Sequence, residues 1–329
     1  MPIAAPVPPF GGAPRLDCQG PPVVALDAPD GCFLGTEEGE WLPVGADGRP
    51  RSVPARLQPH SAALVTVEGE LFVATYAGER ARLRDGHWTH LPGEPVVLAL
   101  VETAAGTVMG DAAGNLTCLE PGGHTRVLAV GEPVTALATA GHGLAVLGSH
   151  GSLGMTSWPV EPGGVLREVA TSPVDGPWAL FRAGGERIGV LGLTRAALVY
   201  PYEQKVVAPS MAFPEGIRDI VMLQGGATGY CLLTDPGELW LLDGELGSPS
   251  RVGLPRGAGA IAGLRATGHG GVLVWTVTGE LYAVQPSRRV RQVLAGGVVL
   301  AYPAPAPERA VAVKWSATEG ACLEQVDLS

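Results

Sequence analysis

Two segments in the last third of the chain are nearly the same: Thr234-Asp-Pro-Gly237-Glu-Leu-Trp-Leu-Leu242 and Thr276-Val-Thr-Gly279-Glu-Leu-Tyr-Ala-Val284. Each reads as two short strands joined at the glycine, because a tight hairpin needs a positive φ that a side chain makes costly. Equivalent turns recur along the whole sequence, at Gly39, Gly78, Gly114, Gly151, Arg195, Gly237, Gly279 and Gly320. Arginine replaces glycine in the fifth turn, so we expect a wider turn there.

The eight turns are separated by 39, 36, 37, 44, 42, 42 and 41 residues. A period of about 40 residues is typical of a propeller that has one four-stranded blade per repeat. An apolar strand precedes each hairpin, and its near-continuous apolar character indicates burial on both faces. These first strands are expected at residues 23–26, 62–65, 96–100, 134–137, 178–181, 217–221, 261–264 and 298–301.

The composition agrees with an all-β fold. The chain has 329 residues with 48 Gly and 30 Pro, which excludes long helices, while 46% hydrophobic and 16% charged residues favour an ordered chain. The sequence predicts one closed β-propeller domain over residues 1–329 with eight four-stranded blades, seven being the alternative. After a third strand at 321–326 the chain ends, so we expect the N-terminal segment 1–22 to close the ring, with part of residues 2–14 as the missing outer strand.

The string Val134-Thr-Ala-Leu-Ala-Thr-Ala-Gly-His-Gly-Leu-Ala-Val-Leu-Gly-Ser-His-Gly151 resembles a WD40 repeat. It has an apolar first strand, a second strand and a Gly-Ser-x-Gly turn. No Trp-Asp dipeptide occurs in the chain, and the Gly-x-Leu-Trp and Gly-x-Leu-Tyr strings at Gly237 and Gly279 look equally like quinoprotein-type repeats. The chain therefore resembles a divergent WD40-like or quinoprotein-like β-propeller of no specific subfamily.

Charge and motif content exclude several function classes. The net charge of −10 argues against nucleic-acid binding, and no segment has the pattern of a signal peptide or of a membrane span. The five cysteines are widely spaced without a Cys-x-x-Cys pair, so we expect reduced core residues in a cytoplasmic protein. We expect no metal, no cofactor and no catalytic residue, and the Ala-, Gly- and Pro-rich composition suggests a bacterial source.

Polar residues on the first strands or at their ends are mixed in type and do not repeat, and ordinary channel-lining side chains are the simpler interpretation. They are Asp27, Glu102, Arg182, Arg218, Asp219, Gln224 and Arg265.

Acidic residues form a more regular pattern. In a propeller blade, the turn between strands two and three lies on the same face as the link that enters the next blade. Acids at these positions predict an acidic rim: Glu38, Glu40, Glu79, Glu94, Glu132, Asp175, Glu215, Asp235, Glu238, Glu280 and Glu319.

These observations favour a noncatalytic protein-protein interaction scaffold or adaptor within a multiprotein assembly. Its partner would be another protein that docks through a basic surface onto the acidic rim. The simpler interpretation is that the rim acids only keep the protein soluble, since a net negative charge keeps molecules apart. The alternative function is an enzyme or a small-ligand-binding propeller that uses the central channel.

Overall fold

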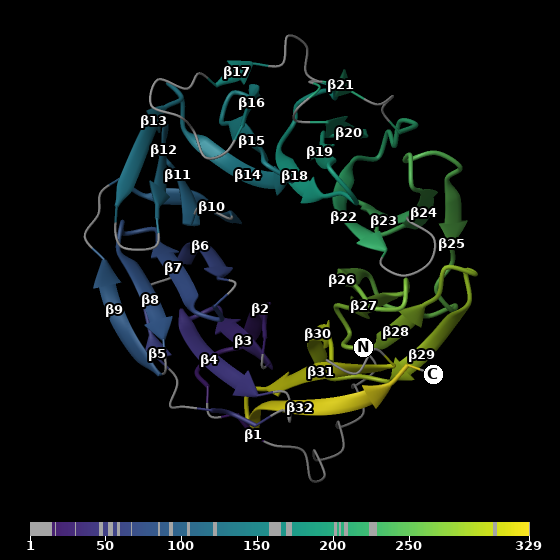
Figure 1. The fold of residues 1–329 in the computed structure, drawn as a ribbon. Coiled ribbons are helices and arrows are strands. Elements are labelled where there is room, and N and C mark those ends of the chain that lie inside the picture. The colour runs from purple at the N-terminus through teal and green to yellow at the C-terminus, as the bar shows by residue number, and fades with distance from the viewer. Residues whose placement is uncertain are drawn as a thin grey trace. The chain divides into compact units, whose positions relative to one another are not determined.

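In the computed structural model, every element is a β-strand, and the strands form eight four-stranded sheets (Figure 1). The structure describes residues 15–16, 18–29, 31–45, 49–51, 55–57, 60–66, 68–84, 86–91, 95–103, 106–120, 124–157, 166–168, 173–200, 203, 205–206, 210–223, 229–304 and 308–328. The chain is an all-β protein with the eight four-stranded antiparallel blades of a β-propeller, as the repeat predicts. Within the described ranges no helix is long and apolar enough to cross a bilayer.

Seven blades are built from four strands that follow one another along the chain. The first blade has β2 (Pro22–Ala28), β3 (Gly31–Thr36), β4 (Glu40–Gly45) and β5 (Ala55–Arg56), and the second has β6 (His60–Val65), β7 (Leu71–Thr75), β8 (Arg80–Arg84) and β9 (His87–Leu91). The third has β10 (Val97–Thr103), β11 (Gly106–Asp111), β12 (Asn115–Leu119) and β13 (Thr125–Ala129), and the fourth has β14 (Val134–Ala140), β15 (Gly143–Gly148), β16 (Leu153–Ser157) and β17 (Arg167–Glu168).

The remaining blades continue the order. The fifth has β18 (Ala179–Arg182), β19 (Ile188–Leu191), β20 (Ala196–Tyr200) and β21 (Lys205–Val206), and the sixth has β22 (Ile217–Leu223), β23 (Gly229–Thr234), β24 (Leu239–Asp243) and β25 (Ser250–Val252). The seventh has β26 (Ile261–Ala266), β27 (Val272–Thr276), β28 (Leu281–Val284) and β29 (Val290–Leu294). The eighth joins β30 (Val298–Pro303), β31 (Arg309–Ser316) and β32 (Gly320–Asp327) to β1 (Arg15–Leu16).

The last blade takes its outer strand from the N-terminal segment, as the sequence predicts. Arg15 pairs with Cys322 and Leu16 with Ala321 in an antiparallel ladder. The strand begins just after the stretch 2–14 proposed for this place, and that stretch lies outside the described residues. Leu16 is buried in the same apolar core as Leu323, so β1 contributes packing as well as backbone hydrogen bonds.

Burial is complete on the second strands of six blades. Every residue of β7, β11, β15, β19, β23 and β27 is buried, whereas first strands such as β10 and β14 are mostly half-buried. The near-continuous apolar character of the first strands predicts burial on both of their faces, so the partial exposure of β10 and β14 differs from that expectation. The difference arises because a second strand has a hydrogen-bonded strand on each side, while a first strand forms one edge of its sheet.

By its internal packing the chain divides into two compact units. The first comprises Met1–Leu57, Leu223–Gly226 and Gly253–Ser329, and the second comprises Gln58–Met222 and Ala227–Val252. In the first unit one apolar core unites the first, seventh and eighth blades, with Leu34, Leu273 and Val313 fully buried. In the second unit separate clusters lie between neighbouring blades, for example around Leu144 and around Leu232. The organisation of residues 1–329 as a single domain stays a prediction.

The hairpin at Arg195 is tighter than the glycine turns, so the expectation of a wider turn is wrong. Gly192 N donates to Arg195 O at 2.8 Å, which encloses only two residues, whereas Thr75 N donates to Glu79 O and encloses three. The three-residue loops place glycine at positive φ, as at Gly78 with φ +86°. In the fifth blade, no residue from Leu193 to Arg195 has a positive φ. A side chain is therefore tolerated where glycine stands elsewhere.

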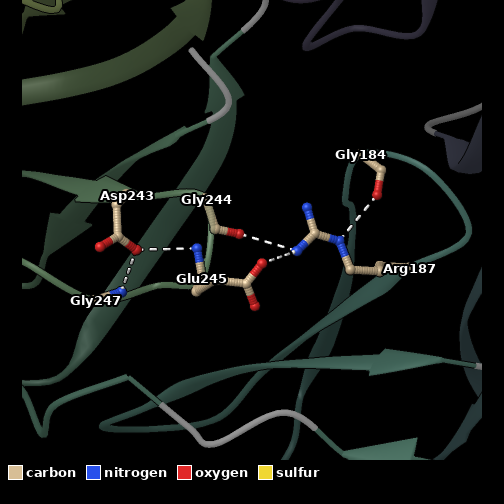
Figure 2. A network of polar contacts seen from close by, with 6 residues as sticks. All are labelled: Gly184, Arg187, Asp243, Gly244, Glu245 and Gly247. Atoms are coloured by element: carbon tan, nitrogen blue, oxygen red, sulfur yellow. Dashed lines mark hydrogen bonds and ion pairs between the residues drawn. The ribbon is translucent and has the colours of Figure 1, made fainter.

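Arg187 clamps the fifth and sixth blades together within the second unit (Figure 2). Its guanidinium donates to Gly184 O at 3.0 Å, to Gly244 O at 3.1 Å and to the Glu245 carboxylate at 2.8 Å. The Asp243 carboxylate accepts hydrogen bonds from the backbone N of Glu245 and of Gly247. These bonds stabilise the β24–β25 turn that contacts Arg187. The arginine side chain is only 11% exposed, so these charge-assisted bonds are partly shielded from water.

Candidate functional site: the entry edges of the blades

Each blade has one edge at which a link enters its first strand and at which its second strand turns into its third. The two features share an edge because successive antiparallel strands reverse direction. We call this the entry edge. The predicted rim acids within the described residues lie at these entry edges, and their contacts there are described below.

A recurring Thr-x-x-Gly-Glu motif builds several of the entry-edge turns. In the seventh blade, Thr276 Oγ1 accepts a hydrogen bond from the backbone N of Glu280 at 3.1 Å. The threonine, three residues before the glycine in these turns, is a functional position that the acidic pattern of the sequence does not include, although its spacing repeats. The hydroxyl supplies a local acceptor that fixes the turn. The equivalent threonine-to-glutamate bonds join Thr36 to Glu40, Thr75 to Glu79 and Thr234 to Glu238.

Three of the predicted rim acids are tied into this local structure. Glu40 is buried and accepts from Gln19 N at 2.5 Å. Glu132 belongs to the link that enters the fourth blade and accepts from His150 N at 2.8 Å and from the Ser152 hydroxyl. Glu280 accepts from Gly259 N at 3.2 Å and from the hydroxyls of Thr276 and Thr278. These carboxylates hold links and turns together, which is a structural role.

These hydrogen bonds also lower the pKa values of the Glu280 and Glu132 carboxyl groups. The Thr276 and Thr278 hydroxyls outweigh the effect of burial and hold the pKa of Glu280 below its usual value. Burial would raise the pKa of Glu132, but the bonds from Ser152 and His150 N, with the charge of the His150 ring, lower it overall. Both groups therefore stay ionised in the folded protein at neutral pH.

The other rim acids face solvent more fully or pair with nearby arginines. Glu38 lies 3.7 Å from Arg56, and Glu238 lies 2.5 Å from Arg251. Glu79, Asp175, Glu215 and Asp235 are exposed, and Glu319 is half-buried. Glu94 lies outside the described residues. The structure places Asp235 next to Glu215, since Asp235 N donates to Gly216 O at 3.2 Å.

Exposed apolar side chains concentrate at the same edges, which the sequence analysis did not predict. Of the seven large apolar residues most exposed in the described part of the chain, five lie on entry-edge turns or in the links into first strands, and a sixth, Val23, is the second residue of the first strand β2. Only Val127, on the outer strand β13, lies elsewhere. The six are Val23, Tyr76, Trp178, Leu193, Met211 and Val277.

Several polar groups of the first strands have local partners, while Gln224 lies outside the described residues. In the first unit, Arg265 donates to the Asp27 carboxylate at 2.8 Å and to Ala25 O at 2.7 Å. In the second unit, the Glu102 carboxylate accepts from the Thr107 hydroxyl at 2.8 Å. Burial raises the pKa of Glu102 and of Asp219, but these two residues lie on different strands, β10 and β22.

The described residues contain no group of three His, Cys, Asp or Glu side chains that could hold a metal ion. No disulfide joins the five cysteines, and four of them are buried in the cores. Burial raises the pKa of Cys32 and of Cys231 to about 12 and that of Cys118 to about 11. These thiols are therefore protonated at neutral pH and poor nucleophiles.

Comparisons of sequence detect no relative: no family model and no curated protein matches the chain. Comparisons of structure find many solved structures of the same fold. BamB from Moraxella catarrhalis is similar with a TM-score of 0.64 at 11% identity, over 95% of each chain. The dihydro-heme d1 dehydrogenase NirN, solved in complex with DHE, has a TM-score of 0.65 at 11% identity, over 97% of this chain and 76% of its own.

The WD40 domain of Pan2 from Neurospora crassa is similar with a TM-score of 0.59 at 11% identity, over 82% of this chain and 88% of that domain. At such low identity the likeness shows the fold alone. The neighbours are as different as an enzyme and a WD40 domain, so they do not separate catalysis from binding. The chain thus has the fold of a divergent β-propeller and fits no specific subfamily.

Proposed function

We propose that this protein is a noncatalytic interaction scaffold that binds another protein along the entry edges of its blades. The observation that carries the proposal is the position of the exposed apolar side chains, five of which lie at these edges within the described residues. Exposed aromatic and aliphatic side chains that are rimmed by polar groups are typical of protein-binding surfaces. The unpaired acids Glu79, Asp175, Glu215 and Asp235 favour a partner with a basic surface.

The local partners of the first-strand polar groups also support binding over catalysis. A catalytic centre brings several titratable groups with shifted pKa values within reach of one substrate. In the described residues the raised acids Glu102 and Asp219 lie on separate blades, and Asp27 is paired with Arg265. The position of the protein in the cytoplasm of a bacterium belongs to the same proposal.

The test is a quantitative capture experiment. The tagged chain, and a variant with Tyr76→Ser, Leu193→Ser and Met211→Ser in the second unit, are expressed in the source cells, and bound proteins are measured by mass spectrometry. We expect the wild type to retain a partner in near-stoichiometric amounts and the variant to lose it. Val127→Ser, which removes an exposed apolar residue from β13, is the matched control and should retain the partner. A wild-type chain that purifies without any stoichiometric partner would contradict the proposal.

The electrostatic part of the proposal needs its own variant. Glu79→Lys, Asp175→Lys and Asp235→Lys reverse exposed charges for which the structure shows no ion pair. Glu132 and Glu280 are unsuitable, because their carboxylates hold turns together and a reversal would disturb the fold. We expect the triple reversal to slow association and to weaken the dependence of binding on salt. Unchanged association kinetics would remove the acidic edge from the proposal.

The alternative is a small-ligand binder or enzyme that works at the first strands. The raised pKa values of Glu102 and Asp219 are the observations that favour it, since shifted carboxyls are frequent at functional sites. A screen of metabolites by thermal shift distinguishes the two functions. A ligand that stabilises the wild type but not an Asp219→Asn or Glu102→Gln variant would favour the alternative.

A further inference from the structure

We propose that the entry edge of the fifth blade is a peptide-docking patch, and that its occupant is a segment of a partner protein with apolar side chains next to lysine or arginine. The patch consists of Trp178, Leu193 and Met211, which are 42%, 60% and 47% exposed. We call it the fifth-blade patch. The inference rests on the proposed scaffold function and names where on the chain, and with which chemistry, a partner is held.

The three side chains belong to segments that are hydrogen-bonded to one turn. Leu193 stands in the two-residue loop between β19 and β20. On one side, Leu193 N donates to Asp175 O at 3.1 Å, in the link that enters the fifth blade and carries Trp178. On the other side, Phe213 N donates to Thr194 O at 2.8 Å, in the link that carries Met211. The turn therefore fixes both links and holds the apolar residues at one place.

The patch is preorganised for binding. The Trp178 indole N–H donates to Gly192 O at 3.1 Å, which fixes the ring although much of it faces solvent. The Leu193 side chain lies beside Gly176, where an added Cβ would come within 3.1 Å of Leu193 Cδ1. A fixed tryptophan is a typical anchor of an interface, and methionine adapts its shape to an apolar partner. Little side-chain entropy is lost when a peptide binds to such a surface.

The fifth blade departs from the repeat at this turn. In four other blades the motif Thr-x-x-Gly-Glu gives the turn a polar start and an acid, as in Thr75 to Glu79. Here the tighter loop needs no glycine and exposes Leu193 at its tip. The fifth-blade turn therefore exposes an apolar side chain without the threonine and the glutamate of that motif.

The charges around the patch decide which peptide fits. Asp175 precedes Trp178 on the same link, while Glu215 and Asp235 lie beside Gly216 at the next entry edge, and all three are exposed. None of the three has an ion pair with another residue in the described part of the chain. Arg195 is the nearby exposed cation in the turn, and Arg218 on β22 is adjacent to Asp219, whose carboxyl it influences. Three acids against one uncommitted arginine favour a basic segment.

The test uses a phage-displayed library of random 12-residue peptides, selected on the immobilised full-length chain. We expect enrichment of sequences with aromatic or aliphatic residues beside Lys or Arg. An enriched peptide, made synthetically with a fluorescent label, is then titrated with wild type and with the Leu193→Ser/Met211→Ser variant, and binding is followed by anisotropy. We expect at least a tenfold weaker Kd for the variant, and an unchanged Kd for the matched control Val127→Ser.

Raising the NaCl concentration from 50 to 300 mM should weaken the wild-type complex, because the acids attract the basic residues over distances that salt screens. The inference is overturned if nothing is enriched, if acidic peptides are enriched, or if the patch variant binds as tightly as wild type. It is also overturned if light scattering shows a wild-type dimer that the variant converts to a monomer, since the occupant is then a second copy of this chain.

These outcomes are separable from a failure of the proposed function. A partner captured equally by wild type and by the Leu193→Ser/Met211→Ser chain would leave the scaffold function standing and remove the fifth-blade patch. Since the substituted side chains are exposed, the variant should keep the thermal unfolding midpoint of the wild type within a few degrees.

Discussion

Gly78 and Gly114 have similar backbone conformations but differ in the space available for a side chain. Gly114 and Gly78 both have a positive φ, +82° and +86°. An added Cβ at Gly114 would lie 2.7 Å from the backbone N and O of Glu132, whereas at Gly78 it would meet nothing within 4 Å. An alanine at Gly78 therefore pays only for its conformation, about 1–2 kcal/mol. At Gly114 it also displaces the link into the next blade.

We predict that Gly114→Ala lowers the free energy of unfolding by clearly more than Gly78→Ala, as measured by urea denaturation of the two variants and wild type. The physical reason is a backbone-to-backbone clash, which rotation of a side chain does not relieve. Equal losses for the two variants would show that the link at Glu132 moves freely.

The carboxylate of Glu132 makes a second prediction at the scale of single residues. Its folded pKa is lowered, so ionised Glu132 contributes stability above its unfolded pKa of about 4.3. That contribution is lost as the pH falls through the folded pKa. Glu132→Gln should therefore be less stable than wild type at pH 6, and the gap should narrow as the pH falls below about 4. Parallel urea titrations at pH 6 and pH 3.5 measure it, and a gap of constant size would refute the assignment.

Between elements, Arg187 is the clearest single connection from one blade to the next. Its guanidinium serves the β18–β19 loop and the β24–β25 turn at once (Figure 2). Hydrogen bonds with a charged partner are worth about 1.5–3 kcal/mol each when broken. We predict that Arg187→Ala lowers the free energy of unfolding by about 2–4 kcal/mol and speeds amide exchange at residues 243–247.

Glu245→Ala is the matched control for the clamp, since it removes one partner and leaves both carbonyl acceptors in place. The Glu245 side chain is 66% exposed, and an exposed ion pair contributes less than about 1 kcal/mol. If the two variants were equally unstable, the ion pair rather than the carbonyl contacts would be the source of the clamp.

For the molecule as a whole, both ends of the chain are needed to complete the eighth blade. Leu16 is 2% exposed and packs in the core of the first unit, while Arg15, beside it on β1, is exposed. We predict that Leu16→Asp causes a large loss of stability and promotes aggregation, because β32 then loses its neighbour and becomes a free sheet edge. Arg15→Asp is the control. Thermal unfolding and light scattering distinguish the two, and equal behaviour would mean that β1 is dispensable.

Much of the fold was predictable because it follows from local rules. Glycines at the hairpins indicate positions with positive φ, and the spacing between them gives the number of residues in a blade. All eight first strands therefore lie at or next to their predicted positions. The tighter turn at Arg195 was not predictable from the missing glycine alone. Its geometry depends on backbone bonds to the links around Asp175 and Phe213, which are distant in sequence.

The candidate site was also predictable only in part. The acids at the entry edges were found from sequence, but sequence did not distinguish Glu280, whose carboxylate is used up by Thr276, Thr278 and Gly259, from the exposed Asp175. Nor did it show that Trp178, placed at the start of a buried strand, has an exposed ring.

The sequence by itself determined the all-β class, the length of one blade and the N-terminal source of the last outer strand, and it favoured eight blades over seven, because repeated turns and apolar strands act over a few residues. Only the tertiary structure decided which acids are structural, how Arg187 joins two blades, and where apolar side chains remain in water. Those properties arise from contacts between segments that lie far apart along the chain, and no local pattern encodes them.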